Sequence, residues 1–250
     1  ATEKLVARLD GTHKVLFPEI DGTFPNHHPN PVDPETLDLL RAEVAAAGAD
    51  LGIGFDGDGD RIGVIDGTGR QVPGDLLTAF LAKDVAARHP GAPILLDVKS
   101  SEAALRLVES AGAAAQIWKT GHSHMKKRMK ELEAPLAGEM SGHIFIADNY
   151  LGFDDAIYAA VRVITQMVKG GQSITEFMDS LPEQHATPEL RIDCPDTVKF
   201  DSMEKIRAHV LSGHDAADVN SIDGVRVRSG DGWWLIRASN TEAALVARAE

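Results

Sequence analysis

Residues 94–118 read ILLDVKSSEAALRLVESAGAAAQIW, and this stretch decides the fold class. The apolar run 94–99 predicts a buried strand, Ser100 is a typical N-cap for the helix that follows, and Gly112 is a typical stop. The apolar run 113–118 predicts a second strand. A strand, a helix and another strand at this spacing favour an α/β protein with parallel sheets.

The same alternation extends along the chain on both sides. It predicts an amphipathic helix at 75–88, a capping box at Ser173 and Glu176 that begins a further helix, and the helices 2–9, 34–47, 125–132 and 154–169. The strands that it predicts are 13–20, 51–55, 61–66, 136–140 and 143–147.

The rhythm changes after the proline-containing stretch 181–188. The pattern there predicts one strand, one helix and then three strands, at 190–193, 203–211, 224–228, 233–237 and 245–248. Residues 229–232 are expected to form a hairpin turn. This last section is therefore expected to be a small α+β module of about 65 residues.

The composition is that of an ordinary globular protein, with 43% hydrophobic and 25% charged residues in 250. The net charge of −13 argues against a general nucleic-acid binder, because phosphates need a positive surface. The single cysteine, Cys194, excludes an internal disulfide and fits a reducing compartment. Neither a membrane span nor the apolar core of a signal peptide within residues 1–10 is expected. We therefore expect a cytoplasmic protein without membrane or nucleic-acid partners.

The sharpest motif is DGDGDR at residues 56–61, directly after a predicted strand. Its aspartates alternate with glycines, so that a curled backbone can direct all three carboxylates at one point. Such oxygen ligands suit Mg²⁺ or Ca²⁺ better than zinc. An EF-hand would need glycine and glutamate where Arg61 and Gly67 stand, so that interpretation fails. Arg61 suggests that a phosphate completes the site, and a solvated acidic turn remains the alternative.

A basic segment, KTGHSHMKKR at residues 119–128, is the second motif in this acidic chain. Its strand-to-helix turn would present backbone N–H groups to an anion, and His122 could titrate near neutral pH. A solvated basic helix face is an equally good interpretation. Lys99, at the end of a predicted strand, faces the usual ligand side of a parallel sheet, although a plain surface lysine fits as well.

The segment GEMSGH at residues 138–143 combines a carboxylate, a hydroxyl and an imidazole in one short turn. Glu139, Ser141 and His143 suit the recognition of sugar hydroxyls, because glutamate can accept hydrogen bonds from two neighbouring OH groups. An ordinary hairpin turn is the alternative.

The segment RASNTE at residues 237–242 offers a guanidinium, two hydroxyls, an amide and backbone N–H groups. Arg237, Ser239, Asn240 and Thr241 are well suited to bind a phosphate. A turn cap formed by the asparagine and threonine is the alternative.

These motifs in this order resemble the α-D-phosphohexomutase superfamily, most closely the bacterial phosphomannomutase/phosphoglucomutase enzymes. The likeness covers nearly the whole chain, with matching segments at 21–31 (DGTFPNHHPNP), 54–61 (GFDGDGDR), 97–99 (DVK), 119–127 (KTGHSHMKK), 138–145 (GEMSGHIF), 152–158 (GFDDAIY) and 237–242 (RASNTE). The chain departs from the family at Ala156 and Ala243, where glycine and proline are expected.

The resemblance implies two α/β modules, with mixed sheets and helices on both faces, followed by a small α+β domain. Residues 1–69 would be the latter part of the metal-binding domain 2, residues 70–183 the sugar-binding domain 3, and residues 184–250 the phosphate-binding domain 4. The first domain of these enzymes, which carries the phosphorylated serine, is expected to be missing from the chain.

The resemblance also implies an activity and a role for each motif. Phosphate would move between O6 and O1 of a hexose phosphate, with Mg²⁺ as cofactor and a hexose 1,6-bisphosphate as activator. The metal ligands would be Asp56, Asp58 and Asp60. The catalytic residues would be Arg61, Lys99 and His122. The substrate-binding residues would be Lys119, Glu139, Ser141, His143, Arg237, Ser239, Asn240 and Thr241.

Two other functions fit the same residues. One is a Mg²⁺-dependent phosphatase of a different fold, with Asp56 as the nucleophile. The other is a catalytically silent chain that binds sugar phosphates, because no serine here lies in a nucleophile loop typical of the family. A mutase would need a phosphoserine, a phosphatase would release inorganic phosphate, and a silent binder would do neither.

Overall fold

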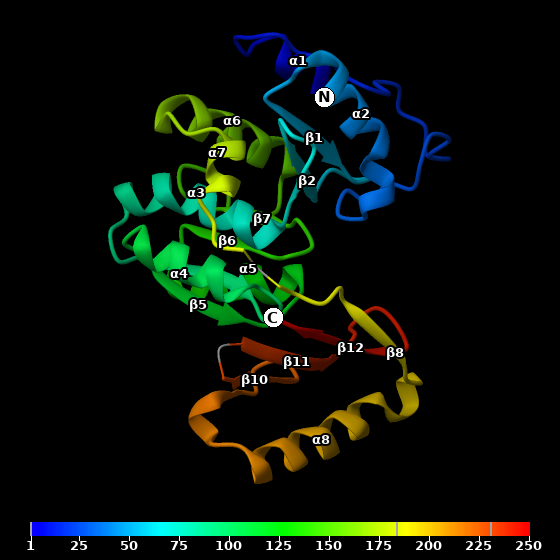
Figure 1. Ribbon diagram of the computed structural model, residues 1–250, viewed down its shortest axis with the longest axis vertical. Helices are drawn as coiled ribbons and strands as arrows, with labels where there is room; N and C mark the ends of the chain where they lie inside the picture. Colours follow the sequence, from blue (N-terminus) through cyan, green and yellow to red (C-terminus); the bar gives the residue numbers. More distant parts are fainter. Residues whose placement is uncertain (1, 184, 231) are drawn as a thin grey trace.

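Three separate sheets organise the chain in a computed structural model, which describes residues 2–183, 185–230 and 232–250 (Figure 1). The first sheet has three strands, the second four and the third five. The mixture of α/β layers followed by an antiparallel sheet with one long helix confirms the expected fold class. None of the helices in the described ranges is long and apolar enough to cross a membrane.

The first sheet has the order β1-β2-β3 and is antiparallel throughout. Its strands are β1 (Leu51–Phe55), β2 (Ile62–Asp66) and β3 (Gln71–Val72), and the helices before it are α1 (Thr2–Val6), the 3₁₀ turn η1 (Pro34–Leu37) and α2 (Asp38–Ala47). The expectation of parallel sheets is wrong here. Because Phe55 pairs with Ile62, the six residues between β1 and β2 form a hairpin connection, which is too short for a parallel crossover.

The predicted strand at 13–20 is also wrong, because this segment contains neither helix nor strand. Its large apolar residues do not pack into a hydrophobic core: Ile20 is fully exposed and Phe17 is 46% exposed. Pro18 cannot donate a backbone hydrogen bond to a neighbouring strand. The predicted helix 2–9 ends at Val6, before the exposed residues that follow.

The second sheet has the order β5-β4-β6-β7. Its strands are β4 (Pro93–Asp97), β5 (Ala114–Trp118), β6 (Leu136–Gly138) and β7 (Ile144–Ile146). β4 is parallel to β5 and β6, which confirms the βαβ prediction, whereas β7 is antiparallel to β6. The connecting helix α4 (Glu102–Ser110) is capped by Ser101 rather than by Ser100.

Helices cover both faces of this sheet. Leu95 packs with Met125 and Met129 of α5 (His122–Leu132), while its neighbours Ile94 and Leu96 belong to the larger core on the other face. That core also contains residues of α3 (Gly74–Arg88), α6 (Ala156–Gly170) and α7 (Ile174–Asp179). The predicted amphipathic character of the α3 helix is wrong: α3 lies in the middle of the core and is buried on almost all sides.

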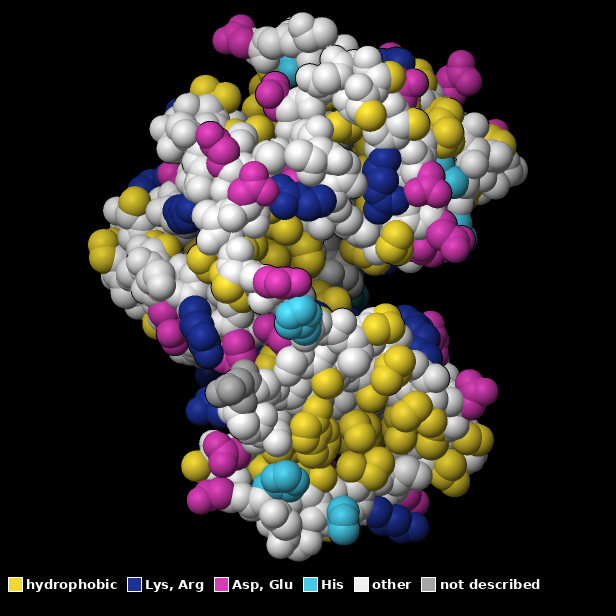
Figure 2. All heavy atoms as spheres, in the orientation of Figure 1, with side chains coloured by type: hydrophobic (Ala, Val, Ile, Leu, Met, Phe, Trp, Pro, Cys, Tyr) yellow, Lys and Arg dark blue, Asp and Glu magenta, His cyan; other side chains and the backbone are white. Residues whose placement is uncertain are grey.

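The third sheet is antiparallel, with the order β8-β12-β11-β10-β9. Its strands are β8 (Leu190–Asp193), β9 (Val219–Asn220), β10 (Val225–Ser229), β11 (Gly232–Ala238) and β12 (Ala244–Ala249). The helix α8 (Asp196–Gly213) is longer than predicted and is followed by the 3₁₀ turn η2 (Ala216–Asp218). Asp231, in the predicted hairpin turn, lies outside the described residues. Figure 2 shows hydrophobic side chains gathered on this module, where Phe200 of α8 is 60% exposed.

Alternate side chains of β11 pack on opposite faces of the third sheet, and one set contacts the middle of the chain. Trp234 and Ile236 pack in the module's own core, whereas Trp233 and Leu235 pack against Val98. Arg226 of β10 lies across the same boundary, with its guanidinium 3.8 Å from the centre of the Trp233 ring. It donates hydrogen bonds to the carbonyls of Val98 and Ser100 and pairs with Glu102, which fixes the module beside the end of β4.

Candidate active site

The acidic loop between β1 and β2 is shaped by its first residue. Oδ1 of Asp56 accepts hydrogen bonds from the backbone N–H groups of Gly59, Asp60 and Arg61, at 3.0, 3.0 and 3.1 Å. Its Oδ2 pairs with Nε of Arg61 at 2.9 Å. Burial opposes the ionisation of Asp56, but the hydrogen bonds and charge of Arg61 outweigh it and hold the pKa of this carboxyl below its usual range.

The three carboxylates of this loop fit a divalent cation. Ligand atoms of Asp56, Asp58 and Asp60 lie within 4.8 Å of one another. Burial and the neighbouring carboxylates of Asp56 and Asp58 raise the pKa of Asp60 to about 6. Crowded carboxylates of this kind are relieved by a hard cation such as Mg²⁺, for which oxygen atoms are the preferred ligands.

The acidic loop lies directly against the turn that carries Glu139, Ser141 and His143. Arg61 forms an isolated antiparallel bridge with His143, and the N–H of Ile62 donates to the carbonyl of Gly142 at 3.0 Å. Gly142 has φ +91°, and a Cβ at this position would lie 2.5 Å from the carbonyl oxygen of Ile62. Only glycine therefore allows the two segments to approach this closely.

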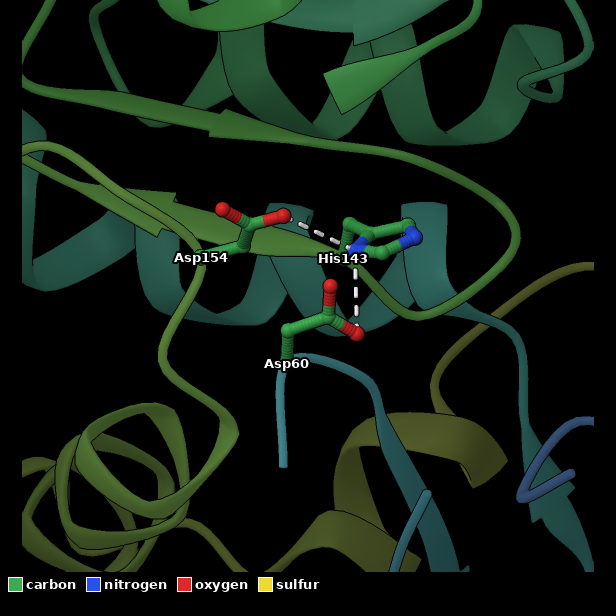
Figure 3. Close-up of side chains that lie close together, drawn as sticks. All are labelled: Asp60, His143 and Asp154. Carbon is green, nitrogen blue, oxygen red and sulfur yellow. Dashed lines mark ion pairs between the residues drawn. The ribbon is translucent and has the colours of Figure 1, made fainter. Parts of the chain in front are cut away.

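His143 links the acidic loop to a second carboxylate, as Figure 3 shows. Its Nδ1 lies 3.1 Å from Asp154 Oδ2 and 3.7 Å from Asp60 Oδ1. Oδ1 of Asp154 accepts from Lys126 at 2.9 Å, and Nζ of Lys126 lies 3.2 Å from Nδ1 of His122. These contacts bring His122 and His143, predicted separately, to a ring separation of 6.0 Å.

Glu139 is almost completely buried at the end of β6. Its Oε1 accepts from the N–H of Gly121 at 2.7 Å and its Oε2 from the hydroxyl of Ser141 at 3.1 Å. Burial and the nearby charge of Asp97 raise the pKa of Glu139, against the effect of the hydrogen bond from Gly121. A buried carboxylate that is already oriented by two donors is well suited to accept further hydrogen bonds from sugar hydroxyls.

Thr120 forms hydrogen bonds both to the end of the second sheet and to the C-terminal module. Its hydroxyl donates to the buried Asp97 at 3.0 Å, and its N–H donates to Asp223 at 3.0 Å. Its carbonyl accepts from the side chain of Asn240 at 3.3 Å. The turn at residues 119–121 therefore contacts both the Glu139 carboxylate, through Gly121, and the RASNTE segment.

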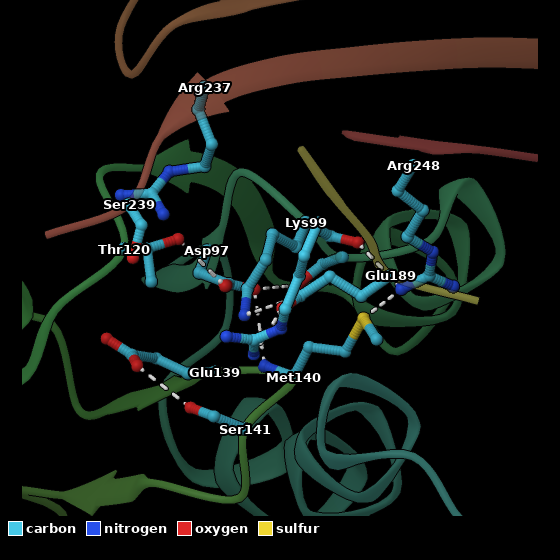
Figure 4. Close-up of polar contacts among 12 residues, drawn as sticks. Asp97, Lys99, Thr120, Glu139, Met140, Ser141, Glu189, Arg237, Ser239 and Arg248 are labelled. Carbon is cyan, nitrogen blue, oxygen red and sulfur yellow. Dashed lines mark hydrogen bonds and ion pairs between the residues drawn. The ribbon is translucent and has the colours of Figure 1, made fainter. Parts of the chain in front are cut away.

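The RASNTE segment begins at the end of β11 and forms a compact turn. Ser239 is buried, and its hydroxyl accepts from the N–H groups of Thr241 and Glu242 at 3.4 and 3.1 Å. Arg237 is also buried, and its Nε donates to Asp223 at 3.1 Å. Figure 4 shows Arg237 and Ser239 beside Thr120, with Glu139 and Ser141 nearby.

Lys99 follows β4 and is partnered by a residue from the start of the C-terminal module. Its Nζ lies 3.2 Å from Oε2 of Glu189, and its carbonyl accepts from Arg248 at 3.1 Å (Figure 4). Burial opposes the ionisation of Glu189, but the charge of Lys99 holds the pKa of Glu189 below its usual value. The predicted strand end at Lys99 is wrong by two residues, because β4 ends at Asp97.

A continuous series of contacts thus joins most of the residues that the sequence singles out, from the acidic loop through His143, Glu139 and Thr120 to Arg237. Lys119 is exposed, and its side chain forms no hydrogen bond or ion pair with a described residue. Figure 2 shows an indentation between the N-terminal part of the molecule and the C-terminal module. The residues that the sequence did not single out for this site are Asp97, Thr120, Lys126, Asp154, Glu189, Asp223 and Arg248. Asp154 lies in the quoted GFDDAIY segment, Asp97 in the DVK segment, and Thr120 and Lys126 in the KTGHSHMKK segment.

Comparisons with known proteins show the family of the chain. Three sequence models of one family match the chain: phosphoglucomutase/phosphomannomutase alpha/beta/alpha domain II at residues 2–69, alpha/beta/alpha domain III at residues 73–185, and the C-terminal domain at residues 189–250.

Individual relatives give the same result. A phosphomannomutase/phosphoglucomutase from Pseudomonas putida is 48% identical over 235 residues, which are 94% of this chain and 50% of the relative. A phosphoglucomutase from Neisseria gonorrhoeae is 40% identical over 247 residues, 99% of this chain and 54% of the relative. The crystal structure of a phosphoglucomutase/phosphomannomutase family protein from Burkholderia thailandensis, 40% identical, superposes with a TM-score of 0.85 over 94% of this chain and 50% of that one. The chain spans about half the length of the curated relatives it matches. It belongs to the phosphoglucomutase/phosphomannomutase family.

Proposed function

We propose that this chain supplies the metal-binding, sugar-binding and phosphate-binding parts of a phosphomannomutase/phosphoglucomutase. This isomerase would move phosphate between O6 and O1 of hexose phosphates. The proposed domains are residues 1–69, 70–183 and 184–250; residues 1 and 184 lie outside the described part of the chain. The family-model matches and the names of the relatives support this proposal.

One observation carries the proposal: the turn at 119–121 is hydrogen-bonded both to Glu139 and to the segment that follows Arg237. Glu139 and Ser141 are proposed to bind two ring hydroxyls, while Arg237, Ser239, Asn240 and Thr241 bind a phosphate on the same ligand. A sugar that carries a phosphate has both kinds of group within one small molecule. Lys119 and His143 are proposed to complete the substrate contacts.

Asp56, Asp58 and Asp60 are the residues that would hold Mg²⁺. The ion, when bound, supplies positive charge that stabilises a transferring phosphoryl group. Arg61 donates to Asp56 at 2.9 Å and to Asn30 at 3.1 Å, which holds its guanidinium at the edge of this loop, where it is proposed to contact the phosphate. Lys99 and His122 are proposed to give and take the proton of the reacting sugar hydroxyl.

The phosphoryl donor is proposed to be a serine of the first domain of the family, which precedes the domain II matched at residues 2–69. A hexose 1,6-bisphosphate is proposed as the activator that keeps this serine phosphorylated. The isolated chain would then bind hexose phosphates without interconverting them, whereas the enzyme that includes the first domain would interconvert them.

Titration calorimetry of this chain tests the binding part of the proposal. Glucose 1-phosphate should bind and glucose should bind much more weakly, because glucose lacks the phosphate. Glu139→Gln should weaken the binding of glucose 1-phosphate at least about tenfold, because an amide cannot accept hydrogen bonds at both of its ends. Glu109→Gln, at an exposed position on α4, is the matched control and should bind like the unchanged chain. Equal binding of glucose and glucose 1-phosphate would contradict the proposal.

A further inference from the structure

We propose that Asp223 is a positioning residue, which orients Arg237 toward the phosphate and ties that arginine to the turn at Thr120. The inference rests on the proposed function, since it takes Arg237 as a phosphate-binding residue. None of the sequence motifs includes Asp223, which lies just before β10.

One oxygen of Asp223 serves both contacts. Its Oδ2 accepts from Nε of Arg237 at 3.1 Å and from the backbone N–H of Thr120 at 3.0 Å. The side chains of Asp223 and Arg237 are only 15% and 5% exposed, so solvent screens this pair weakly. Because Thr120 belongs to the middle of the chain and Arg237 to the C-terminal module, this carboxylate spans the boundary between them.

The backbone at Gly224, beside Asp223, lies unusually close to the backbone of Arg237. Gly224 has φ +75°, and a Cβ there would lie 2.2 Å from the carbonyl oxygen of Ile236 and 2.7 Å from Cα of Arg237. The turn therefore packs directly against the backbone of Arg237, at a distance that only glycine allows. The backbone that carries this carboxylate is thus held beside Arg237.

The pairing leaves the other end of the guanidinium for a ligand. Nη2 of Arg237 is buried and has no hydrogen-bond partner among the described residues. A buried donor of this kind favours an acceptor that arrives with the ligand, and a phosphate oxygen is the strongest such acceptor in the proposed reaction. By occupying Nε, Asp223 fixes the plane of the guanidinium and determines the direction in which Nη2 points.

A double-mutant cycle separates positioning from a general structural role. Calorimetry with glucose 1-phosphate is carried out on the unchanged chain, Asp223→Ala, Arg237→Ala and the double variant. Asp223→Ala should weaken binding about tenfold or more when Arg237 is present, and by less than about twofold when Arg237 is already alanine. Asp201→Ala, at an exposed position on α8, is the control and should change nothing. An equal loss in both backgrounds, or no loss in either, would overturn the inference.

A second measurement does not depend on ligand binding. Hydrogen exchange of the Arg237 Nε–H, followed by NMR in the ligand-free chain, should be at least about tenfold slower in the unchanged chain than in Asp223→Ala. Equal exchange rates would overturn the inference. Slow exchange together with no binding of glucose 1-phosphate would instead show that the contact exists and that the proposed function is wrong.

Discussion

The buried carboxylate of Asp154 lies 3.1 Å from Nδ1 of His143, and its other oxygen accepts a 2.9 Å hydrogen bond from Lys126. Burial disfavours the protonated imidazole, but the carboxylates of Asp154, Glu139 and Asp60 outweigh burial and raise the pKa of His143. In the same way, His143 and Lys126 outweigh burial and hold the pKa of Asp154 well below its usual range.

Asp154→Asn should therefore lower the pKa of His143, which an NMR titration of the imidazole would show. A histidine whose pKa is raised on folding stabilises the fold below its unfolded pKa of about 6.5 and loses this contribution as pH rises through the folded value. The destabilisation caused by Asp154→Asn should thus be larger at pH 5.5 than at pH 9. An unchanged titration curve for His143 would contradict the pairing.

The acidic loop should bind divalent cations in a pH-dependent way. Because burial and two neighbouring carboxylates raise the pKa of Asp60 to about 6, its carboxyl must lose a proton before it can bind a cation. Affinity for Mg²⁺ should therefore fall as pH decreases from 7 to 5, and calorimetry should detect protons released on binding. Asp60→Asn should weaken binding and remove this release, whereas Asp50→Asn, at an exposed position before β1, should keep both. Binding of equal strength at pH 5 and pH 7 would argue against the assignment.

The same crowding predicts an effect on stability. Asp60→Asn should raise the melting temperature of the metal-free chain at pH 7, because it removes one of three mutually repelling carboxylates. The gain should shrink in saturating Mg²⁺, which stabilises the unchanged loop by binding it. Differential scanning calorimetry with and without Mg²⁺ gives both values. A lower melting temperature for Asp60→Asn without metal would contradict this explanation.

Asp148 should be important for stability, away from the candidate site. Its side chain is 1% exposed and pairs with Arg88, His89 and Arg162. Asp148→Asn should lower the free energy of unfolding by about 3 kcal/mol, because the neutral amide loses charge-assisted hydrogen bonds to Arg88 and to Arg162, which is itself only 11% exposed. The control is Asp38→Asn, in a solvent-exposed pair with Arg41, which should cost at most about 1 kcal/mol.

The pH dependence of this effect has a definite sign. Burial opposes the ionisation of Asp148, but its cationic partners hold the pKa well below the usual range. The stabilisation is therefore present above the unfolded pKa of about 3.9 and is lost as pH falls below it. Urea titrations at several pH values should show the difference between Asp148→Asn and the unchanged chain shrinking below about pH 4. A difference that stays constant would count against the pairing.

Arg226 should decide whether the C-terminal module unfolds with the rest of the chain. Arg226→Lys keeps the positive charge but removes the guanidinium group, which donates hydrogen bonds to Val98, Ser100 and Glu102 at the same time. Calorimetry should then show an earlier transition for the module, or a clearly broadened one. Arg228→Lys, two residues along the same strand and exposed, should leave the unfolding curve unchanged. A single unaltered transition in Arg226→Lys would contradict this role.

Local signals in the sequence predict much of the fold. Apolar runs located β4, β5 and four strands of the last module, but not the two-residue β9, and the capping box at Ser173 and Glu176 is present as expected. What packs around an element depends on distant parts of the chain. Helix α3 is buried on nearly all sides because neighbouring helices and strands of the first and second sheets cover it. The run 13–20 has strand-forming residues but no partner strand. A sequence pattern alone does not contain either fact.

The site divides in the same way. Ligand-type residues that cluster in sequence, such as the three aspartates of the acidic loop, can be recognised before the structure is known. Asp223 and Glu189 cannot, because each becomes significant only when folding brings it to a partner about 14 or 90 residues away in sequence, Arg237 or Lys99. Positioning residues of this kind have no spacing pattern of their own.

The most direct measurement follows ³¹P NMR signals after mannose 1-phosphate or glucose 1-phosphate is added to the enzyme that joins this chain to the family's first domain, with Mg²⁺ and catalytic hexose 1,6-bisphosphate. Each 1-phosphate should be replaced by its 6-phosphate without release of inorganic phosphate, for both sugars, and Asp58→Asn should abolish the conversion. Accumulation of inorganic phosphate, which a phosphatase would produce, or unchanged spectra for both sugars would contradict the proposed mutase activity.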